Sequence, residues 1–353
     1  MKHRRWQPFF LAGSLSVALL LSACSTLARY VGASPDRICV VLDTGQENDK
    51  GFNEYTLRGA RAAAQELDVQ FAHVSSRSEK DYAPNINGFI AEGCDLIMTV
   101  GFLMGAATAE AARANPDIHF AIVDVAYYPG AGCDEGVDSC YTAEGGLANV
   151  TSLMFAEDEV GYLAGTLAGC LTESGVIGSV AGMRIPPVEK FVVGYQTGAE
   201  RIRPDVQALN EYIPSFDDPT AGLLLGEEQL RQGADVIFGV GGNTGNGGLV
   251  AAHDAGVYAI GVDVDQYYTL PAVSGSLVTS AMKNMDVAAA DAVRAFVLGE
   301  LEPGVELSTV ANGGIGLAPF HDFETAIPES CKEALSAAEA GLADGSIKTG
   351  YGP

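Results

Sequence analysis

Positive charge is scarce in this sequence. Its 353 residues include only 20 lysines and arginines against 45 aspartates and glutamates, which gives a formal net charge of −25 at pH 7. Because so acidic a surface repels phosphate groups, this balance argues against a nucleic-acid-binding protein. A surface that keeps the protein soluble, or adapts it to salt, is the simplest interpretation.

Sequence patterns for metal binding and catalysis are also missing. The five histidines are scattered without ligand spacing, no C-x-x-C pair occurs, and no G-x-S-x-G elbow is present. A nucleoside hydrolase would need a bound metal or a positioned water, and the sequence has no D-x-D-x-x-x-D-D cluster. We therefore expect that the protein is not an enzyme and binds neither a cofactor nor a metal. A nucleoside hydrolase is the weaker alternative.

No apolar run is long enough to span a membrane. Basic residues within 1–8 precede an almost wholly apolar stretch at 9–21, which is typical of a secretory signal and shorter than the ~20 residues that cross a bilayer. The next residues, Leu21-Ser22-Ala23-Cys24, resemble the lipobox of bacterial lipoproteins, which implies cleavage before Cys24 and lipid on it. A plain signal peptide with a chance cysteine is the alternative.

These features predict the location of the protein. We expect a signal peptide at 1–23 and a lipidated tether at 24–35. The lipid would hold the protein at the cell membrane, on the extracytoplasmic side, either in the periplasm or at the cell surface.

The cysteines suit an oxidising compartment, because an even number remains after Cys24. Cys133 and Cys140 flank an acidic, glycine-containing loop and are the best candidates for a disulfide. Cys39 and Cys94 each stand at or just before the start of a predicted strand, and we expect those two strands to be neighbours, so the cysteines could also pair. The remaining two, Cys170 and Cys331, would pair by elimination. Buried free thiols are the alternative.

Strands and helices are expected to alternate in two similar halves. The first half has predicted strands at 38–43, 69–74, 95–100 and 119–125, and the second at 176–180, 205–213, 235–240 and 258–263. Helices are expected between them, and elements near 273–280, 286–298 and 308–317 complete both halves. This order predicts an α/β fold of two doubly wound parallel-sheet lobes joined by a hinge. We expect lobe 1 at 36–150 and 266–300, and lobe 2 at 151–265 and 301–353.

Ligands of such sheets bind beyond the carboxyl ends of the strands, so residues just past each strand are the candidates. After the first strand, a polar loop at 45–53 opens a helix and holds one aromatic residue, Phe52. This loop can cap the helix and stack a flat ring, or it is a capping loop with a packed phenyl ring. Asp124 ends another strand, within an apolar run where packing alone rarely places an acid.

The second half has its own strand-end residues. The glycine-rich stretch 239–248 follows a strand and precedes a helix, but it fits neither a Walker A loop nor G-x-G-x-x-G. Asp263 ends the next strand, where a carboxylate can accept two hydrogen bonds from vicinal hydroxyls, as in sugar recognition. Lys283 ends a further strand, and its position beside Ser280 and Asn284 suggests a pocket rather than a surface lysine.

Several motifs in order resemble one family, the basic membrane lipoproteins, which are substrate-binding proteins of purine-nucleoside ABC transporters. The resemblance covers residues from about 38 to 320, and these motifs carry it: Asp49-Lys50-Gly51-Phe52-Asn53, Val100-Gly101-Phe102, Val123-Asp124, Gly161-Tyr162-Leu163-Ala164-Gly165, Val188-Glu189-Lys190-Phe191, Gly241-Gly242-Asn243-Thr244-Gly245, Gly261-Val262-Asp263-Val264-Asp265-Gln266 and Thr279-Ser280-Ala281-Met282-Lys283-Asn284. It implies a periplasmic-binding-protein fold of type I. The chain departs from the family at Val240, where alanine is usual, and by an insertion around 133–140.

The resemblance also implies a ligand site for a base and a ribose. Phe52 would stack on the base, and the hydrogen-bonding edge of the base would lie near Asp49, Asn53 and Asp124. A second aromatic, Phe102 or Phe238, would complete the stack. The ribose would be held by Asp263, Lys283 and the amide of Gly242.

The sequence therefore predicts a monomeric receptor that captures purine nucleosides in an inter-lobe cleft. Its partners would be the permease and ATPase subunits of an ABC transporter, and the membrane through its lipid anchor. A sugar or autoinducer receptor is the alternative among binding proteins. An adhesin-like surface lipoprotein is the alternative outside transport.

Overall fold

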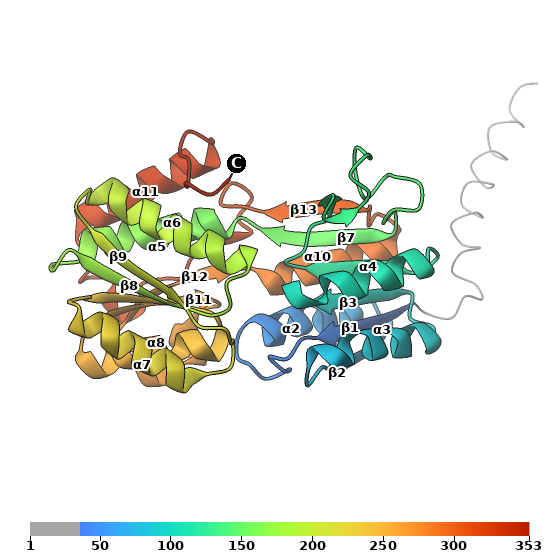
Figure 1. The fold of residues 1–353 in the computed structure, drawn as a ribbon, viewed down its shortest axis with the longest axis horizontal. Helices are drawn as coiled ribbons and strands as arrows, with labels where there is room; N and C mark the ends of the chain where they lie inside the picture. Colours follow the sequence, from blue (N-terminus) through green and yellow to red (C-terminus); the bar gives the residue numbers. More distant parts are fainter. Residues whose placement is uncertain (1–35, 353) are drawn as a thin grey trace, which may run out of the picture. The chain divides into compact units, whose positions relative to one another are not determined.

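Two six-stranded sheets organise the part of the chain that the computed structural model describes, residues 36–352 (Figure 1). The first sheet has the order β13-β7-β4-β3-β1-β2, and the second has the order β14-β12-β11-β10-β8-β9. Within these two sheets all neighbouring strands are parallel except β12 and β14. The predicted α/β fold of two doubly wound lobes is confirmed. The predicted signal peptide, Cys24 and the tether at 24–35 lie outside the described residues.

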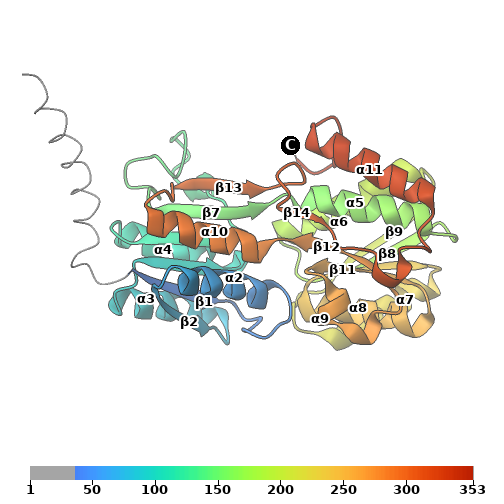
Figure 2. The same ribbon diagram turned by 180° about the vertical axis from the view of Figure 1, so that it is seen from behind.

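The first lobe surrounds the first sheet. Its strands are β1 (Arg37–Leu42), β2 (Gln70–Ser75), β3 (Leu96–Val100), β4 (His119–Val123), β7 (Val150–Phe155) and β13 (Gly304–Ser308), and its longer helices are α2 (Phe52–Glu66), α3 (Tyr82–Ala91), α4 (Gly105–Ala114) and α10 (Met285–Leu298). Alternate residues of β1 enter different cores, Ile38 and Val40 facing α2, and Cys39 and Val41 facing α3 and α4. Helices therefore cover both faces, as a parallel sheet requires. Figure 2 shows α10 beside α2.

The second lobe surrounds the second sheet. Its strands are β8 (Val176–Ala181), β9 (Gln207–Tyr212), β10 (Val236–Val240), β11 (Tyr258–Asp263), β12 (Leu277–Lys283) and β14 (Ile315–Leu317), and its helices are α5 (Glu157–Leu171), α6 (Pro186–Ile202), α7 (Pro219–Arg231), α8 (Gly242–Ala255), α9 (Gln266–Thr269) and α11 (Glu329–Ala343). Helices α5 and α6 pack against one face, and α7 and α8 pack against the other. Helix α11 lies against α5 on the outside (Figure 2).

The chain crosses between the lobes after β7, after β12 and after β13. The predicted lobe boundaries are wrong at these crossings. Strand β7, placed beyond 150 in lobe 2, pairs with β4 in the first sheet. Strand β12, expected within 266–300 of lobe 1, pairs with β11 in the second sheet, and β13, expected within 301–353 of lobe 2, pairs with β7 in the first.

Three disulfides join the six cysteines of residues 36–352, as predicted. The Cα atoms are 6.0 Å apart in Cys39–Cys94, 5.4 Å in Cys133–Cys140 and 5.8 Å in Cys170–Cys331. The first ties β1 to the turn before β3, and the last ties α5 to α11. The second closes the loop between β4 and β7, where the short strands β5 (Tyr128–Pro129) and β6 (Gly132–Cys133) pair. Among the described residues no helix has the length and apolar character to span a membrane.

Candidate functional site

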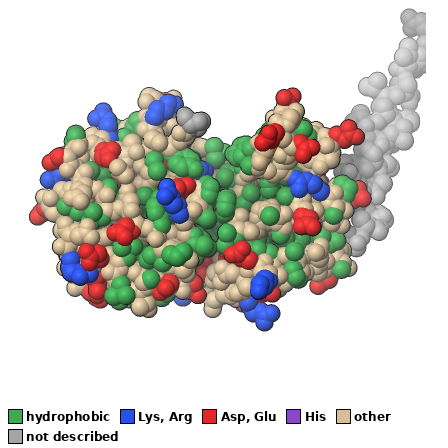
Figure 3. Space-filling model, in the orientation of Figure 1, with side chains coloured by type: hydrophobic (Ala, Val, Ile, Leu, Met, Phe, Trp, Pro, Cys, Tyr) green, Lys and Arg blue, Asp and Glu red, His purple; other side chains and the backbone are tan. Residues whose placement is uncertain are grey.

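A cavity of about 360 Å³ lies between the lobes, at the carboxyl ends of strands from both sheets. On the face shown in Figure 3, hydrophobic side chains gather along the junction of the lobes, whereas charged side chains are scattered over the outer surfaces. Eight of the nine residues predicted to bind ligand line the cavity: Asp49, Phe52, Asn53, Phe102, Asp124, Gly242, Asp263 and Lys283. The cavity is therefore where the strand-end argument places a ligand site.

Phe238 is the exception, and its prediction as a stacking residue is wrong. It lies in the middle of β10 and is fully buried. Strand alternation turns its ring toward α6, where the ring centroids of Phe191 and Tyr195 lie 6.1 and 5.0 Å away. Phe238 belongs to the core of the second lobe.

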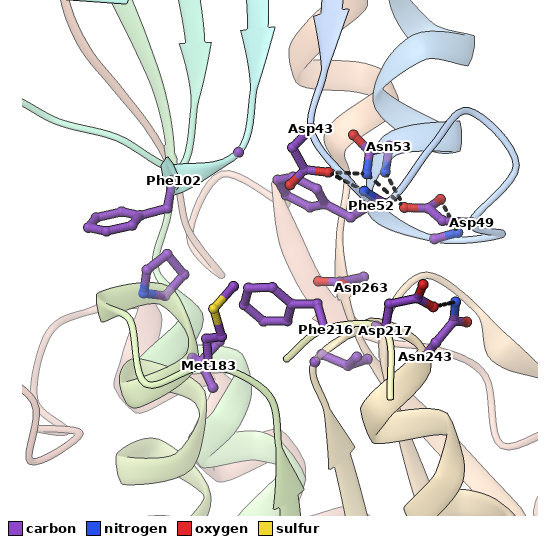
Figure 4. Close-up of a pocket in the computed structure, with 18 of the residues that line it drawn as sticks. Asp43, Asp49, Phe52, Asn53, Phe102, Met183, Phe216, Asp217, Asn243 and Asp263 are labelled. Atoms are coloured by element: carbon purple, nitrogen blue, oxygen red, sulfur yellow. Dashed lines mark hydrogen bonds between the residues drawn. The ribbon is translucent and has the colours of Figure 1, made fainter. Parts of the chain in front are cut away.

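The aromatic residue that the sequence argument missed is Phe216. It lies in the loop between β9 and α7, and its ring enters the cavity from the second lobe while Phe52 enters from the first (Figure 4). Both phenylalanines lie near a helix start: Phe52 is the first residue of α2, and Phe216 lies shortly before α7, which is capped by the Asp218 side chain at 2.9 Å from the Ala221 nitrogen. Figure 4 shows Met183 beside Phe216, and Phe102 at the other end of the cavity from Asp263.

The loop that carries Phe52 is organised by Asp49. One carboxylate oxygen accepts hydrogen bonds from the backbone nitrogens of Gly51 (2.9 Å) and Glu54 (3.1 Å). The other oxygen accepts from the backbone nitrogen (2.9 Å) and side-chain nitrogen (3.0 Å) of Asn53. Because a carboxylate has about four acceptor sites, Asp49 is fully engaged in holding the start of α2. Asp49 therefore caps the start of α2, as the capping interpretation of this loop predicts.

Asn53 links the start of α2 to the end of β1. Its side-chain nitrogen donates to Asp43 (2.8 Å) and to Asp49, while its side-chain oxygen is buried and has no partner in the described part of the chain. Asp43, which the sequence argument missed, lines the cavity directly after β1. Burial raises the pKa of Asp43, opposed by hydrogen bonds from the Gly45 nitrogen and from Asn53. The Asp43 carboxylate therefore places acceptor oxygens at this edge of the cavity, which suits a ligand with N–H donors.

Lys283 is the centre of a buried ion-pair network. Its Nζ lies 2.6 Å from each carboxylate oxygen of Asp124 and 3.0 Å from Oε1 of Glu157. The other oxygen of Glu157 accepts from Lys190 at 3.0 Å. Burial raises the pKa of Asp124 to about 6 although the charge of Lys283 lowers it. Burial lowers the pKa of Lys283, but the surrounding carboxylates outweigh this effect and raise it above its usual range.

Asp263 stands beside this network without a partner. Its carboxylate forms no hydrogen bond or ion pair within residues 36–352. Burial raises the pKa of Asp263 to about 7, against the lowering effect of Lys283. Figure 4 shows this side chain between Phe52 and Phe216. It is therefore a free acceptor at the centre of the cavity.

Amide side chains form the polar end of the cavity. Gln266 donates to Asn246 at 2.7 Å, Asn246 to Asn243 at 3.3 Å, and Asn243 to Asp217 at 2.8 Å. This chain also lines an adjoining cavity of about 340 Å³. Gly242 begins α8 here, after Gly241, whose φ of 138° and close approach to Gly182 leave no room for a Cβ atom. Among the described residues no group of three or more His, Cys, Asp or Glu side chains is arranged to hold a metal ion.

Comparison with known proteins places the chain in a family. The family model described as ABC transporter substrate-binding protein, PnrA-like, matches residues 37–335. The ABC transporter nucleoside-binding protein BmpA of Lactococcus lactis is 27% identical over 330 residues, covering 88% of each chain. An uncharacterized lipoprotein of Pyrococcus horikoshii is 30% identical over 294 residues, covering 79% of this chain and 68% of its own. A solute-binding protein of an ABC transporter system from Aeropyrum pernix superposes with a TM-score of 0.77 at 26% identity, covering 89% and 93% of the two chains.

Proposed function

Because this chain belongs to the PnrA-like family of ABC transporter substrate-binding proteins, we propose that it captures purine nucleosides in the inter-lobe cleft for uptake. Proteins of this kind are transport components rather than enzymes, and they work with permease and ATPase subunits. The purine nucleoside is the proposed ligand. The proposed location is the extracytoplasmic side of the cell membrane, with Cys24 as the lipid site.

The observation that carries this proposal is the pair of phenyl rings of Phe52 and Phe216, which enter one cavity from opposite lobes (Figure 4). Two rings on opposite walls suit a flat aromatic ligand, because aromatic pairs stabilise each other by about 0.5–1.5 kcal/mol beyond the area that they bury. The rings come from different lobes, so a base stacked between them would favour the closed arrangement of the lobes.

The polar groups around the rings are suited to bind the base and the ribose of a nucleoside. The carboxylate of Asp43, which lines the cavity and accepts a hydrogen bond from Asn53, suits N–H donors on a base edge. The unpartnered carboxylate of Asp263 suits the two hydroxyls of a ribose. The Lactococcus lactis relative is named as a nucleoside-binding protein, which agrees with this ligand class.

Titration calorimetry tests the proposal on a chain beginning at Ser25, which keeps the whole compact unit from Arg37 onward. The ligands are guanosine, adenosine, inosine, cytidine, ribose and the free bases. We expect purine nucleosides to bind with dissociation constants in the micromolar range or tighter, and chromatography to show no release of free base. Binding of ribose without any nucleoside would contradict base stacking and favour a sugar receptor. Release of free base would favour a hydrolase.

A further inference from the structure

The ammonium group of Lys283 has no hydrogen left for a ligand in this structure. An ammonium group has three N–H donors. Asp124 and Glu157 supply three oxygens within 3.0 Å of Nζ, and the lysine side chain is only 1% exposed. The second oxygen of Glu157 is held by Lys190. Two lysines and two acids therefore form a complete network of zero net charge.

Asp263 is the additional acid beside this neutral network. Four charged groups act on its carboxylate: Lys283 from the end of β12, Asp124 after β4, Asp49 before α2 and Glu157 at the start of α5. Of these four only Lys283 is positive, and its donors point at other carboxylates. A carboxylate without a hydrogen bond in a half-buried site is costly as an anion and much less so as a neutral acid.

A vicinal diol would reverse this preference. The two hydroxyls donate to the two oxygens of a carboxylate, and hydrogen bonds to the charged form favour ionisation. We propose that ligand capture is coupled to loss of a proton from Asp263, so that the receptor is neutral at this position when empty and anionic when a diol is bound. This coupling rests on the proposed binding of a ribose-containing ligand.

The sign of the pH dependence follows from the two states of Asp263. In the empty cleft the pKa of Asp263 is about 7, and donation by the diol lowers it. The diol must therefore displace a proton at pH values below about 7, and it binds an already ionised group above that range. Affinity should be about tenfold weaker at pH 6 than at pH 8.

Calorimetry with guanosine measures the coupling directly. At pH 6.5, titrations in phosphate and in imidazole, which differ in protonation enthalpy, should reveal release of roughly one-half to one proton per guanosine bound. Asp263→Asn, which imitates the neutral acid, should bind guanosine with heats that do not depend on the buffer and with little change in affinity between pH 6 and pH 8. Asp124 begins to titrate in the same range, so this variant separates the two acids.

Two comparisons make the experiment decisive. Asp254→Asn removes an exposed carboxylate on the same lobe and should keep the proton release of the original chain. The ligand 2′,3′-dideoxyguanosine lacks the diol and should bind without proton release. Buffer-independent heats for guanosine, proton uptake, or equal release from both ligands would overturn the coupling. If ribose binds and guanosine does not, the nucleoside proposal fails while the same titrations with ribose decide the coupling. If no diol binds, both proposals fail.

Discussion

Asp124 and Asp263 occupy equivalent positions in the two sheets and have different surroundings. Each stands between two valines at the end of a strand, β4 or β11, and each has a φ of 67°. This left-handed backbone is uncommon outside glycine and asparagine or aspartate, and it occurs frequently at functional sites. Asp124 is paired with Lys283, whereas Asp263 is unpaired. The same backbone geometry therefore places one aspartate in an ion pair between the lobes and leaves the other facing the cavity.

This difference predicts that loss of Asp263 depends on the sugar of the ligand. Asp263→Ala removes the acceptor of two hydroxyl donors, and an unpaired polar group costs about 1–3 kcal/mol. Guanosine binding should weaken on the order of tenfold or more, while 2′,3′-dideoxyguanosine should lose much less. Calorimetry with the two ligands gives the ratio. Equal losses would show that Asp263 acts through the base or through folding.

The stacking assignment predicts unequal effects of two phenylalanines. Phe216→Ala should weaken guanosine binding on the order of tenfold, because it removes one face of the stack. Phe102→Ala is the matched control, since Phe102 lines the same cavity at its other end. Urea unfolding of both variants checks that the fold is retained. A larger loss from Phe102→Ala would make Phe102 the stacking residue instead.

Sequence patterns could locate residues at strand ends but not the contacts between distant segments. Phe52, Asp124, Asp263 and Lys283 all follow or end strands, so eight of nine predicted residues reach the cavity. Glu157 was invisible to this argument, because its role depends on Lys190 and Lys283 meeting it from other elements. Phe238 was misplaced because only the direction of alternation in β10 decides which face its ring enters.

At the scale of elements, close packing of α5 on α6 supports the second lobe. Gly161, Gly165 and Gly169 of α5 lie against the backbone of α6, and Gly194 and Gly198 of α6 lie against the backbone of α5. A Cβ atom on Gly165 would lie 1.9 Å from the carbonyl oxygen of Tyr195. The helices approach this closely only because these side chains are missing. Glu157 and Lys190 stand on these two helices, so their spacing also sets the ion-pair network.

Gly165→Ala should therefore destabilise the protein although alanine is the better helix former. Forcing an extra methyl group into a packed core costs about 1–3 kcal/mol or more, which exceeds the gain of about 1 kcal/mol in helix propensity. Gly88→Ala in α3 is the matched control, because a Cβ atom there meets nothing within 4 Å. Urea midpoints should fall for Gly165→Ala and stay or rise for Gly88→Ala. A rise for both would contradict the packing argument.

Strands β7 and β13 were not predicted, because their local hydrophobic pattern is not that of a buried strand. Strand β7 contains Thr151 and Ser152, which interrupt the apolar run although both are buried. Strand β13 is short, and its middle residues are exposed at the edge of the first sheet. Both strands belong to the sheet through pairing with partners far along the chain, β13 being separated from β7 by most of lobe 2. The lobe boundaries were wrong for the same reason, because crossings are decided by pairing.

At the scale of the whole molecule, binding and attachment are separate properties of the chain. The described residues from Arg37 onward form one compact unit that includes both sheets, the cavity and three disulfides. The residues that predict attachment lie before this unit, at Cys24 and in the tether that follows. Loss of the anchor should therefore change the location of the receptor and leave its ligand affinity unchanged.

Cys24→Ser tests this separation in cells. A single acyl chain binds membranes only marginally, so stable attachment requires more than one chain. Lipoprotein processing would supply a diacylglyceryl group on the sulfur of Cys24, often with a further chain on its nitrogen. The variant should remain an unprocessed precursor held by its signal, or reach soluble fractions if an ordinary signal peptidase cleaves after Ala23. Mass spectrometry of the mature N-terminus of the original chain decides the point, because an unmodified Cys24, or a start elsewhere in 25–35, contradicts lipid attachment. Guanosine affinity of the released variant should equal that of the chain beginning at Ser25, since the cleft lies wholly within the compact unit.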